Sequence, residues 1–173
     1  GASSGGLAYD IMVALSEKAP DVLESLDYRL VDVNTHRLEE AIAAMEEVGF
    51  ANHISAENPE SLTPEPGLVL ANEVADALPV HRFVMREGSI REVLAGVNAE
   101  GEFIDVEADP EADLLSPIQA HFEQQAISLP DGARFEFSPA VAEWGRGIAQ
   151  SLTQGLAVVI DYGYEASRLY KGH

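Results

Sequence analysis

Polar residues of the kinds that bind ligands stand at or near the ends of three apolar runs in the sequence. In open α/β sheets, ligands bind at the carboxyl ends of parallel strands, where such residues converge. The pattern therefore predicts one binding site assembled from three separate places in the chain. The residues and their runs are Asp32 in 28–33, Asn72 and Glu73 after 67–71, and Asp161 after 156–160.

The sequence opens with the glycine-rich segment Gly1-Ala2-Ser3-Ser4-Gly5-Gly6, followed by a helical pattern from Leu7 to about Lys18. A glycine-rich turn that opens a helix lets the backbone approach a ligand closely, and Asp32 can accept hydrogen bonds from ribose hydroxyls. Together these features favour a cofactor that contains a nucleoside. The same small residues also suit a purely structural turn, so the pattern alone leaves both interpretations open.

The opening segment also reads Gly1-x-Ser3-x-Gly5, the pattern of a hydrolase nucleophile elbow. Asp161 and His173 follow in the chain order Ser…Asp…His. A nucleophile elbow needs a strand before it and an oxyanion loop from further upstream, and the sequence supplies neither. A serine hydrolase is therefore kept as a minor alternative.

Strand and helix patterns alternate along the chain, which predicts a parallel sheet covered by helices on both faces. Asn34 or Thr35 is expected to cap a helix that Gly49 stops, and 67–71 and 156–160 are expected to be buried strands. Residues 81–87, 90–97 and 102–107 are expected to form antiparallel strands of an insertion, with turns at Glu87-Gly88 and near Gly101.

Two later segments are expected to be helical. Residues 109–128 form helix in part, with Pro117 preventing one straight helix. Ser138 and Pro139 resemble an N-cap and first helical residue. The stripe that follows, expected to lie in the core and to reach the stop at Gly155, consists of Val141, Trp144, Ile148 and Leu152.

Composition excludes several classes of function. The chain has 173 residues, a formal net charge of −20 and no cysteine, which excludes disulfides, thiolate metal sites and cysteine nucleophiles. Such an acidic chain is not suited to nucleic-acid backbones, and the five scattered histidines suggest no metal site. With no membrane span or signal peptide visible, we expect a cytoplasmic protein that contacts neither nucleic acid nor membrane.

The run 70–83 contains Asn72-Glu73-Val74-Ala75-Asp76-Ala77-Leu78-Pro79. It resembles the Asn-Glu-x-x-Asp-Ala-Leu-Pro signature of MidA-like S-adenosylmethionine-dependent methyltransferases, which include the mitochondrial complex I assembly methyltransferase. The ending 160–164 also matches this family. Between the two stand the residues of the family's Glu-x-x-Pro…Trp pattern, namely Glu136, Pro139 and Trp144.

The resemblance implies a Rossmann-like class I methyltransferase fold in a single domain, 1–173, with an insertion at 81–135. It implies S-adenosylmethionine as cofactor and methyl transfer to arginine of a protein substrate. No metal is implied. The implied cofactor-binding residues are Gly1, Ser3, Gly5, Asp32 and Asn72, and the implied catalytic residues are Asn72, Glu73 and Asp76.

Carboxylates suit this reaction, because a protonated arginine is a poor nucleophile until acidic groups orient it and localise its charge. The competing interpretation is that Glu73 and Asp76 only cap a helix. The family usually has glycine at the position of Ser3 and glutamate at the position of Asp32; serine can still make a tight turn if its φ is negative, and aspartate still offers two acceptors. A non-catalytic, cofactor-binding assembly factor is the alternative function.

The fold implied by the resemblance has a central strand that feeds the glycine loop, between the strands that carry Asp32 and Asn72. The sequence starts at Gly1, so no residues here can form that strand. We therefore expect a fragment that lacks the first strand, with further residues before Gly1 and after His173 in the natural protein.

Overall fold

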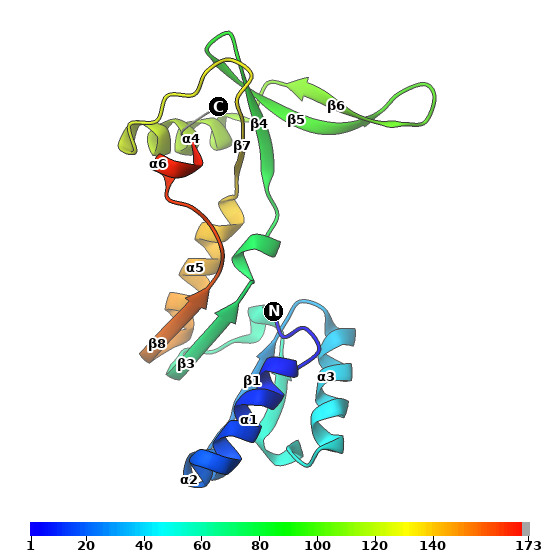
Figure 1. The fold of residues 1–173 in the computed structure, drawn as a ribbon, viewed down its shortest axis with the longest axis vertical. Helices are drawn as coiled ribbons and strands as arrows, with labels where there is room; N and C mark the ends of the chain where they lie inside the picture. The colour runs from blue at the N-terminus through cyan, green and yellow to red at the C-terminus, as the bar shows by residue number, and fades with distance from the viewer. Residues whose placement is uncertain (171–173) are drawn as a thin grey trace. The chain divides into compact units, whose positions relative to one another are not determined.

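The structure is a computed structural model that describes residues 1–170 (Figure 1). It combines helices with parallel and antiparallel strands, which confirms the predicted α/β class. Its contacts divide the chain into two compact units, and each is described by itself. The first unit contains Gly1–Glu73 and Ala149–Ile160, and the second contains Val74–Ile148 and the chain from Asp161 onward.

The first unit holds two parallel pairs of strands. β1 (Tyr28–Val31) pairs with β2 (Ile54–Glu57), and β3 (Glu65–Asn72) pairs with β8 (Leu152–Ile160). β2 was not predicted from the sequence. The helices of this unit are α1 (Gly6–Lys18), α2 (Pro20–Glu24) and α3 (Thr35–Glu47), with short 3₁₀ turns at Ala51–His53 and Pro59–Ser61.

The core of the first unit lies where α1 and α3 pack on β1. Each helix contributes its small or flexible apolar residues, and Asn34 caps α3 by accepting a hydrogen bond from the backbone of Arg37, as predicted. Burial of this cluster removes apolar surface from water and stabilises the unit. Its buried members are Ala8, Met12, Leu30, Leu38, Ala41 and Met45.

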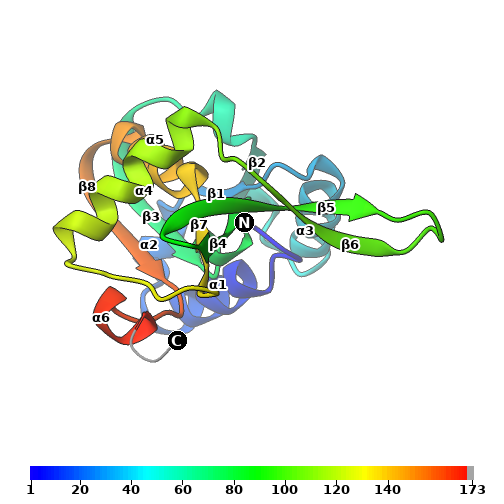
Figure 2. The same cartoon turned by 90° about the horizontal axis from the view of Figure 1, so that it is seen from above.

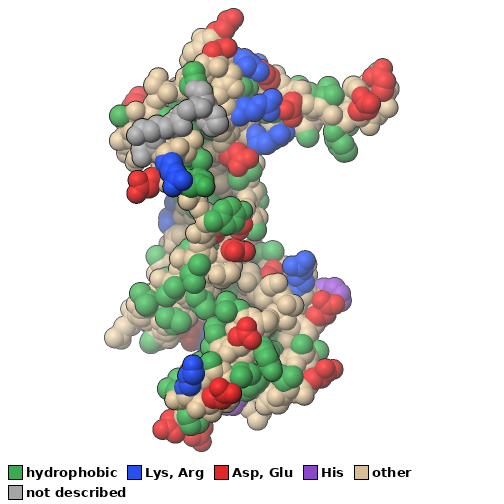
Figure 3. All heavy atoms as spheres, viewed as in Figure 1, with side chains coloured by type: hydrophobic (Ala, Val, Ile, Leu, Met, Phe, Trp, Pro, Cys, Tyr) green, Lys and Arg blue, Asp and Glu red, His purple; other side chains and the backbone are tan. Residues whose placement is uncertain are grey.

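The expectation that 67–71 and 156–160 are buried strands is wrong for the described residues. Leu68 is 64% exposed and Leu156 is 58% exposed, and of the eight residues of β3 only Ala71 is buried. β3 and β8 pair with each other in a sheet of two strands, and both keep exposed apolar side chains, namely Leu68, Leu156, Val159 and Ile160. Hydrophobic atoms are correspondingly visible on the surface near these strands (Figure 3).

The second unit is built on a four-stranded antiparallel sheet in the order β6-β5-β4-β7. The predicted antiparallel strands are confirmed as β4 (His81–Arg86), β5 (Ser89–Val97) and β6 (Phe103–Ala108), whereas β7 (Arg134–Phe137) was not predicted. In both ribbon views the β5–β6 hairpin extends beyond β4 and β7 (Figures 1 and 2). The remaining elements are the 3₁₀ turn η3 (Ala75–Ala77), α4 (Ala112–Gln124) and α6 (Ala166–Leu169).

Two helical predictions needed correction. α4 continues through Pro117, because Leu114 and Ile118 on either side are buried against the aromatic side chains of the sheet. α5 (Pro139–Ser151) begins with the predicted Ser138 cap but ends before Leu152, which starts β8. No α5 residue is buried, so its stripe does not form a core in the described residues.

Candidate functional site

The glycine loop is fastened to the end of β1. The backbone N–H of Gly5 donates to the carbonyl of Ala2 at 3.0 Å, which closes the loop. The N–H of Ala2 donates to Asp32 Oδ2 at 2.8 Å, and the N–H of Asn34 donates to Asp32 Oδ1 at 2.9 Å. The structure therefore brings the predicted cofactor-binding residues 1, 3, 5 and 32 together, with the Asp32 carboxylate at their centre.

Two residues of this loop adopt left-handed backbone conformations. Gly5 has φ 79° and is buried, and a Cβ atom there would lie 3.2 Å from the Cβ of Ala41, so the position requires glycine. Ser3 has φ 50°, so the condition of a negative φ, under which a serine makes this turn easily, is not met. A serine in this conformation carries backbone strain that a glycine would not.

The environment of Asp32 favours its charged form. Partial burial raises the pKa of this carboxyl, but the backbone N–H groups of Asn34, Ala2 and Ser3 stabilise the charge and hold the pKa below its usual value. Each carboxylate oxygen has a second lone pair, so both remain able to accept a hydroxyl hydrogen bond. Asp32 thus holds the loop in place and can also accept hydrogen bonds from a ligand.

Asn72 and Glu73 stand at the end of β3, beside the end of β8. Asn72 is in register with Ile160, and the N–H of Glu73 donates to the carbonyl of Ile160 at 2.8 Å. Glu73 also has a left-handed backbone, with φ 49°, and both side chains are exposed. Residues forced into such conformations gather at functional sites, where the surrounding structure holds them.

Asp76 and Asp161 meet in the second unit. Asp161 Oδ2 accepts hydrogen bonds from the backbone N–H groups of Ala75 at 3.0 Å and Asp76 at 3.3 Å. The capping role considered for Glu73 and Asp76 therefore falls to Asp161, because the N-cap residue of η3 is Val74 and makes no side-chain cap. The Asp76 side chain stays exposed and available.

Sequence analysis missed Glu57, which ends β2 next to Asp32. The N–H of Asp32 donates to the carbonyl of Glu57 at 3.4 Å, and Glu57 Oε2 is buried with no hydrogen-bond partner in the described residues. The signal was the same as for Asp32, a carboxylate at the end of a strand, but the strand itself went unrecognised. Glu57 helps to line a hollow of about 310 Å³, together with Thr35, Leu38, Glu39, Ile42, Ala56 and Asn58.

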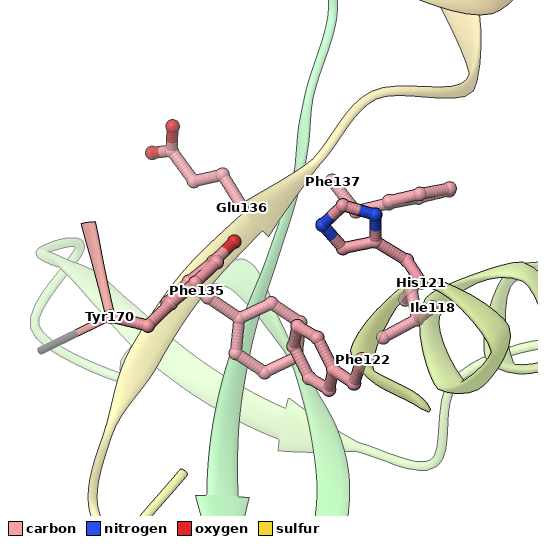
Figure 4. Close-up of a pocket in the computed structure, with 7 residues that line it drawn as sticks. All are labelled: Ile118, His121, Phe122, Phe135, Glu136, Phe137 and Tyr170. Carbon is pink, nitrogen blue, oxygen red and sulfur yellow. The ribbon is translucent and has the colours of Figure 1, made fainter. Parts of the chain in front are cut away.

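The second unit has a smaller hollow, of about 90 Å³, between α4 and β7. Figure 4 shows His121 and Phe122 on α4 facing Phe135 and Phe137 on β7, while Glu136 points away from them. The Phe122 and Phe135 rings meet edge to face with centroids 5.0 Å apart. This hollow belongs to the aromatic core of the sheet.

His81 is hydrogen-bonded within the antiparallel sheet. Its Nδ1 lies 2.7 Å from Oε1 of Glu92, whose side chain is 11% exposed. Among residues 1–170, no group of histidine and acidic side chains could hold a metal ion. None of the helices described here is long and apolar enough to cross a membrane. His173 of the hydrolase alternative lies outside the described residues.

Two solved structures from Burkholderia thailandensis are similar to this chain. An uncharacterised protein matches with a TM-score of 0.83 and 24% identity. A protein described as a "likely methyl transferase", bound to S-adenosyl-homocysteine, matches with a TM-score of 0.78 and 26% identity. Both matches cover 99% of this chain, which spans 44% and 42% of the two relatives, respectively, less than half of each. No curated protein matches the chain.

The family model described as "Putative S-adenosyl-L-methionine-dependent methyltransferase" matches residues 1–173, the whole of the chain. This agrees with the resemblance noted from the signature at Asn72–Pro79. The chain belongs to this S-adenosyl-L-methionine-dependent methyltransferase family.

Proposed function

We propose that this protein is an S-adenosylmethionine-dependent methyltransferase and that its methyl acceptor is an arginine side chain of another protein. The observation that supports the cofactor is the hydrogen bond that ties the glycine loop to Asp32, in which the N–H of Ala2 donates to Asp32 Oδ2 at 2.8 Å. A relative with the same fold is bound to S-adenosyl-homocysteine, the product that such a cofactor leaves.

The residues of the first unit suit this cofactor. Asp32 presents carboxylate oxygens at the end of β1, where ribose hydroxyls are recognised in such folds. Glu57 adds a second carboxylate at the end of the neighbouring strand, with a buried oxygen that has no hydrogen-bond partner within the described part of the chain. An unpaired buried acceptor is costly, and a donor group of the cofactor would relieve that cost. When bound, the cofactor supplies an electrophilic methyl group on a sulfonium.

The proposal that arginine accepts the methyl group rests on Asn72, Glu73 and Asp76. Their side chains are exposed and include two carboxylates, which would hold a protonated guanidinium by charge-assisted hydrogen bonds. Oriented in this way, one guanidinium nitrogen forms the new bond to the methyl group as the sulfur–methyl bond breaks, and it then releases a proton to solvent. The net charge of −20 suits a basic partner, and binding of nucleic acid or membrane is not part of the proposal.

The experiment compares binding with transfer in the full-length protein. Calorimetry with S-adenosylmethionine tests the cofactor. Mass spectrometry of extract from cells that lack the protein, after incubation with a deuterated-methyl cofactor, tests for labelled arginine. We expect Glu73→Gln to keep cofactor affinity and to lower transfer by roughly a hundredfold, because a positioned charge is lost where the reaction occurs.

Glu87→Gln is the matched control, because Glu87 is also exposed and also left-handed, with φ 51°, but lies in the β4–β5 turn. It should leave transfer unchanged. Wild-type transfer in Glu73→Gln would remove that residue from the proposed site. Cofactor binding without any transfer would instead favour the non-catalytic assembly factor. Label on residues other than arginine would correct the proposed acceptor.

A further inference from the structure

Asp161 is the side chain through which the chain after β8 fixes the backbone that carries Asp76. Its Oδ2 accepts the N–H of Ala75 at 3.0 Å and the N–H of Asp76 at 3.3 Å. Its Oδ1 accepts the N–H of Tyr162 at 2.9 Å. One carboxylate therefore joins two segments that lie 85 residues apart in sequence.

These contacts act on a short segment that otherwise has its own turn hydrogen bonds, from the N–H of Ala77 to the carbonyl of Val74 and from the N–H of Leu78 to the carbonyl of Ala75, each at 3.3 Å. η3 is a single 3₁₀ turn of three residues, and none of its residues is buried. Packing therefore does little to fix where Asp76 points. The backbone N–H of Asp76 is fixed by Asp161 instead, which leaves the Asp76 carboxylate free for a substrate.

We infer that Asp161 is a positioning residue for methyl transfer, one that acts through the backbone of Ala75 and Asp76 and does not itself touch the substrate. This inference rests on the proposed function, because it assumes that Asp76 helps to orient the acceptor. Misplacement of an orienting group by about 1 Å can cost roughly a hundredfold in rate. Asp161 thus affects the rate of transfer without taking part in cofactor binding.

The test uses Asp161→Asn and Asp161→Ala in the full-length protein. Asparagine keeps one oxygen acceptor and turns an amide N–H₂ toward one of the backbone donors, whereas alanine keeps no acceptor. We expect transfer to extract proteins to fall roughly tenfold in Asp161→Asn and roughly a hundredfold in Asp161→Ala. Calorimetry with S-adenosylmethionine should give wild-type affinity for both variants.

Hydrogen exchange supplies a readout independent of activity. The amides of Ala75 and Asp76 should exchange roughly five- to tenfold faster in Asp161→Ala, which removes the oxygen that accepts both hydrogen bonds. Asp131→Ala is the matched control, because Asp131 Oδ1 likewise accepts a backbone N–H, that of Glu87 at 2.6 Å, in a turn away from Asp76. It should leave both transfer and these two amides unchanged.

The outcomes separate the inference from the proposed function. Faster exchange with wild-type transfer would make Asp161 purely structural and overturn the inference. Unchanged exchange of the Ala75 and Asp76 amides would show that they do not depend on hydrogen bonds to Asp161, and this too would overturn the inference. An equal loss of transfer in Asp131→Ala would show a general effect of lost stability and would also overturn the inference. A wild-type protein that transfers no methyl group would instead refute the proposed function, and the inference with it.

Discussion

The loop at Ser3 and the turn at Glu73 place non-glycine residues in almost the same left-handed conformation, with φ 50° and 49°. Behind Ser3 stands a packed core, in which buried Gly5 approaches Ala41 and Met12 is fully buried. Behind Glu73, one backbone hydrogen bond reaches the exposed end of β8. The first region is held by packing as well as by hydrogen bonds to Asp32, whereas the second is held by a hydrogen bond between exposed groups.

This difference teaches where stability and chemistry are coupled. A change in the core behind the loop should affect both folding and cofactor binding. A change in the exposed turn should affect transfer with little cost in stability, because surface substitutions alter unfolding free energies by about 0.5 kcal/mol or less. Each prediction below challenges one side of the comparison.

The largest effect is expected from Met12→Ala. Met12 is 0% exposed in the core cluster behind the glycine loop, so its truncation should lower the free energy of unfolding by about 2–5 kcal/mol. Denaturant unfolding measures this change, and Leu7→Ala, at a residue 48% exposed on the same helix, is the control. Similar losses in both variants would contradict the assignment of the core.

Asp32→Ala should weaken cofactor binding by about 1–3 kcal/mol, because it removes the hydrogen-bond acceptors at the end of β1 and frees the N–H of Ala2. Calorimetry with S-adenosyl-homocysteine measures the change. Asp32→Asn, which keeps one oxygen acceptor, should lie between the alanine variant and the wild type. Unchanged affinity in a folded Asp32→Ala protein would reject this role for Asp32.

Ser3→Gly should raise the free energy of unfolding by about 0.5–1 kcal/mol if relief of the left-handed strain outweighs the greater freedom of the unfolded chain. Thermal unfolding measures the gain. Ala126→Gly, at another residue with φ 51° but outside the loop, should give a comparable gain without touching the cofactor site. A lower free energy of unfolding in Ser3→Gly, with a gain in Ala126→Gly, would mean that the serine hydroxyl stabilises the loop.

The smallest effect near neutral pH is expected from titration of Asp32. The pKa of Asp32 is lower in the folded protein than the ordinary value of about 3.9. Its contribution to the free energy of unfolding is therefore fully present above that ordinary value. The contribution is lost as the pH falls through the lower folded pKa. The part of the free energy of unfolding that Asp32 contributes should therefore stay constant between about pH 8 and 5 and decline only below about pH 4, as measured by denaturant unfolding across this range. Asp32→Asn should abolish the decline attributable to this group.

Local patterns in the sequence predicted most elements of both units. The Asn34 cap, the Ser138 cap and the turns at Glu87-Gly88 and Gly101 depend on a few adjacent residues, and the structure has them all. Two four-residue strands, β2 and β7, went unpredicted. Such short strands carry too little periodicity to be recognised, and they form because a neighbouring strand supplies their hydrogen bonds.

The sequence by itself determined the family, through the run Asn72–Pro79, and it identified the carboxylates at three strand ends. Tertiary structure decided what these carboxylates contact. Asp32 holds the glycine loop 30 residues away, Asp161 caps the turn at Ala75, and Glu57 buries an oxygen at the end of β2. A hydrogen bond between residues far apart in sequence depends on how the strands are aligned, and no local pattern encodes that alignment.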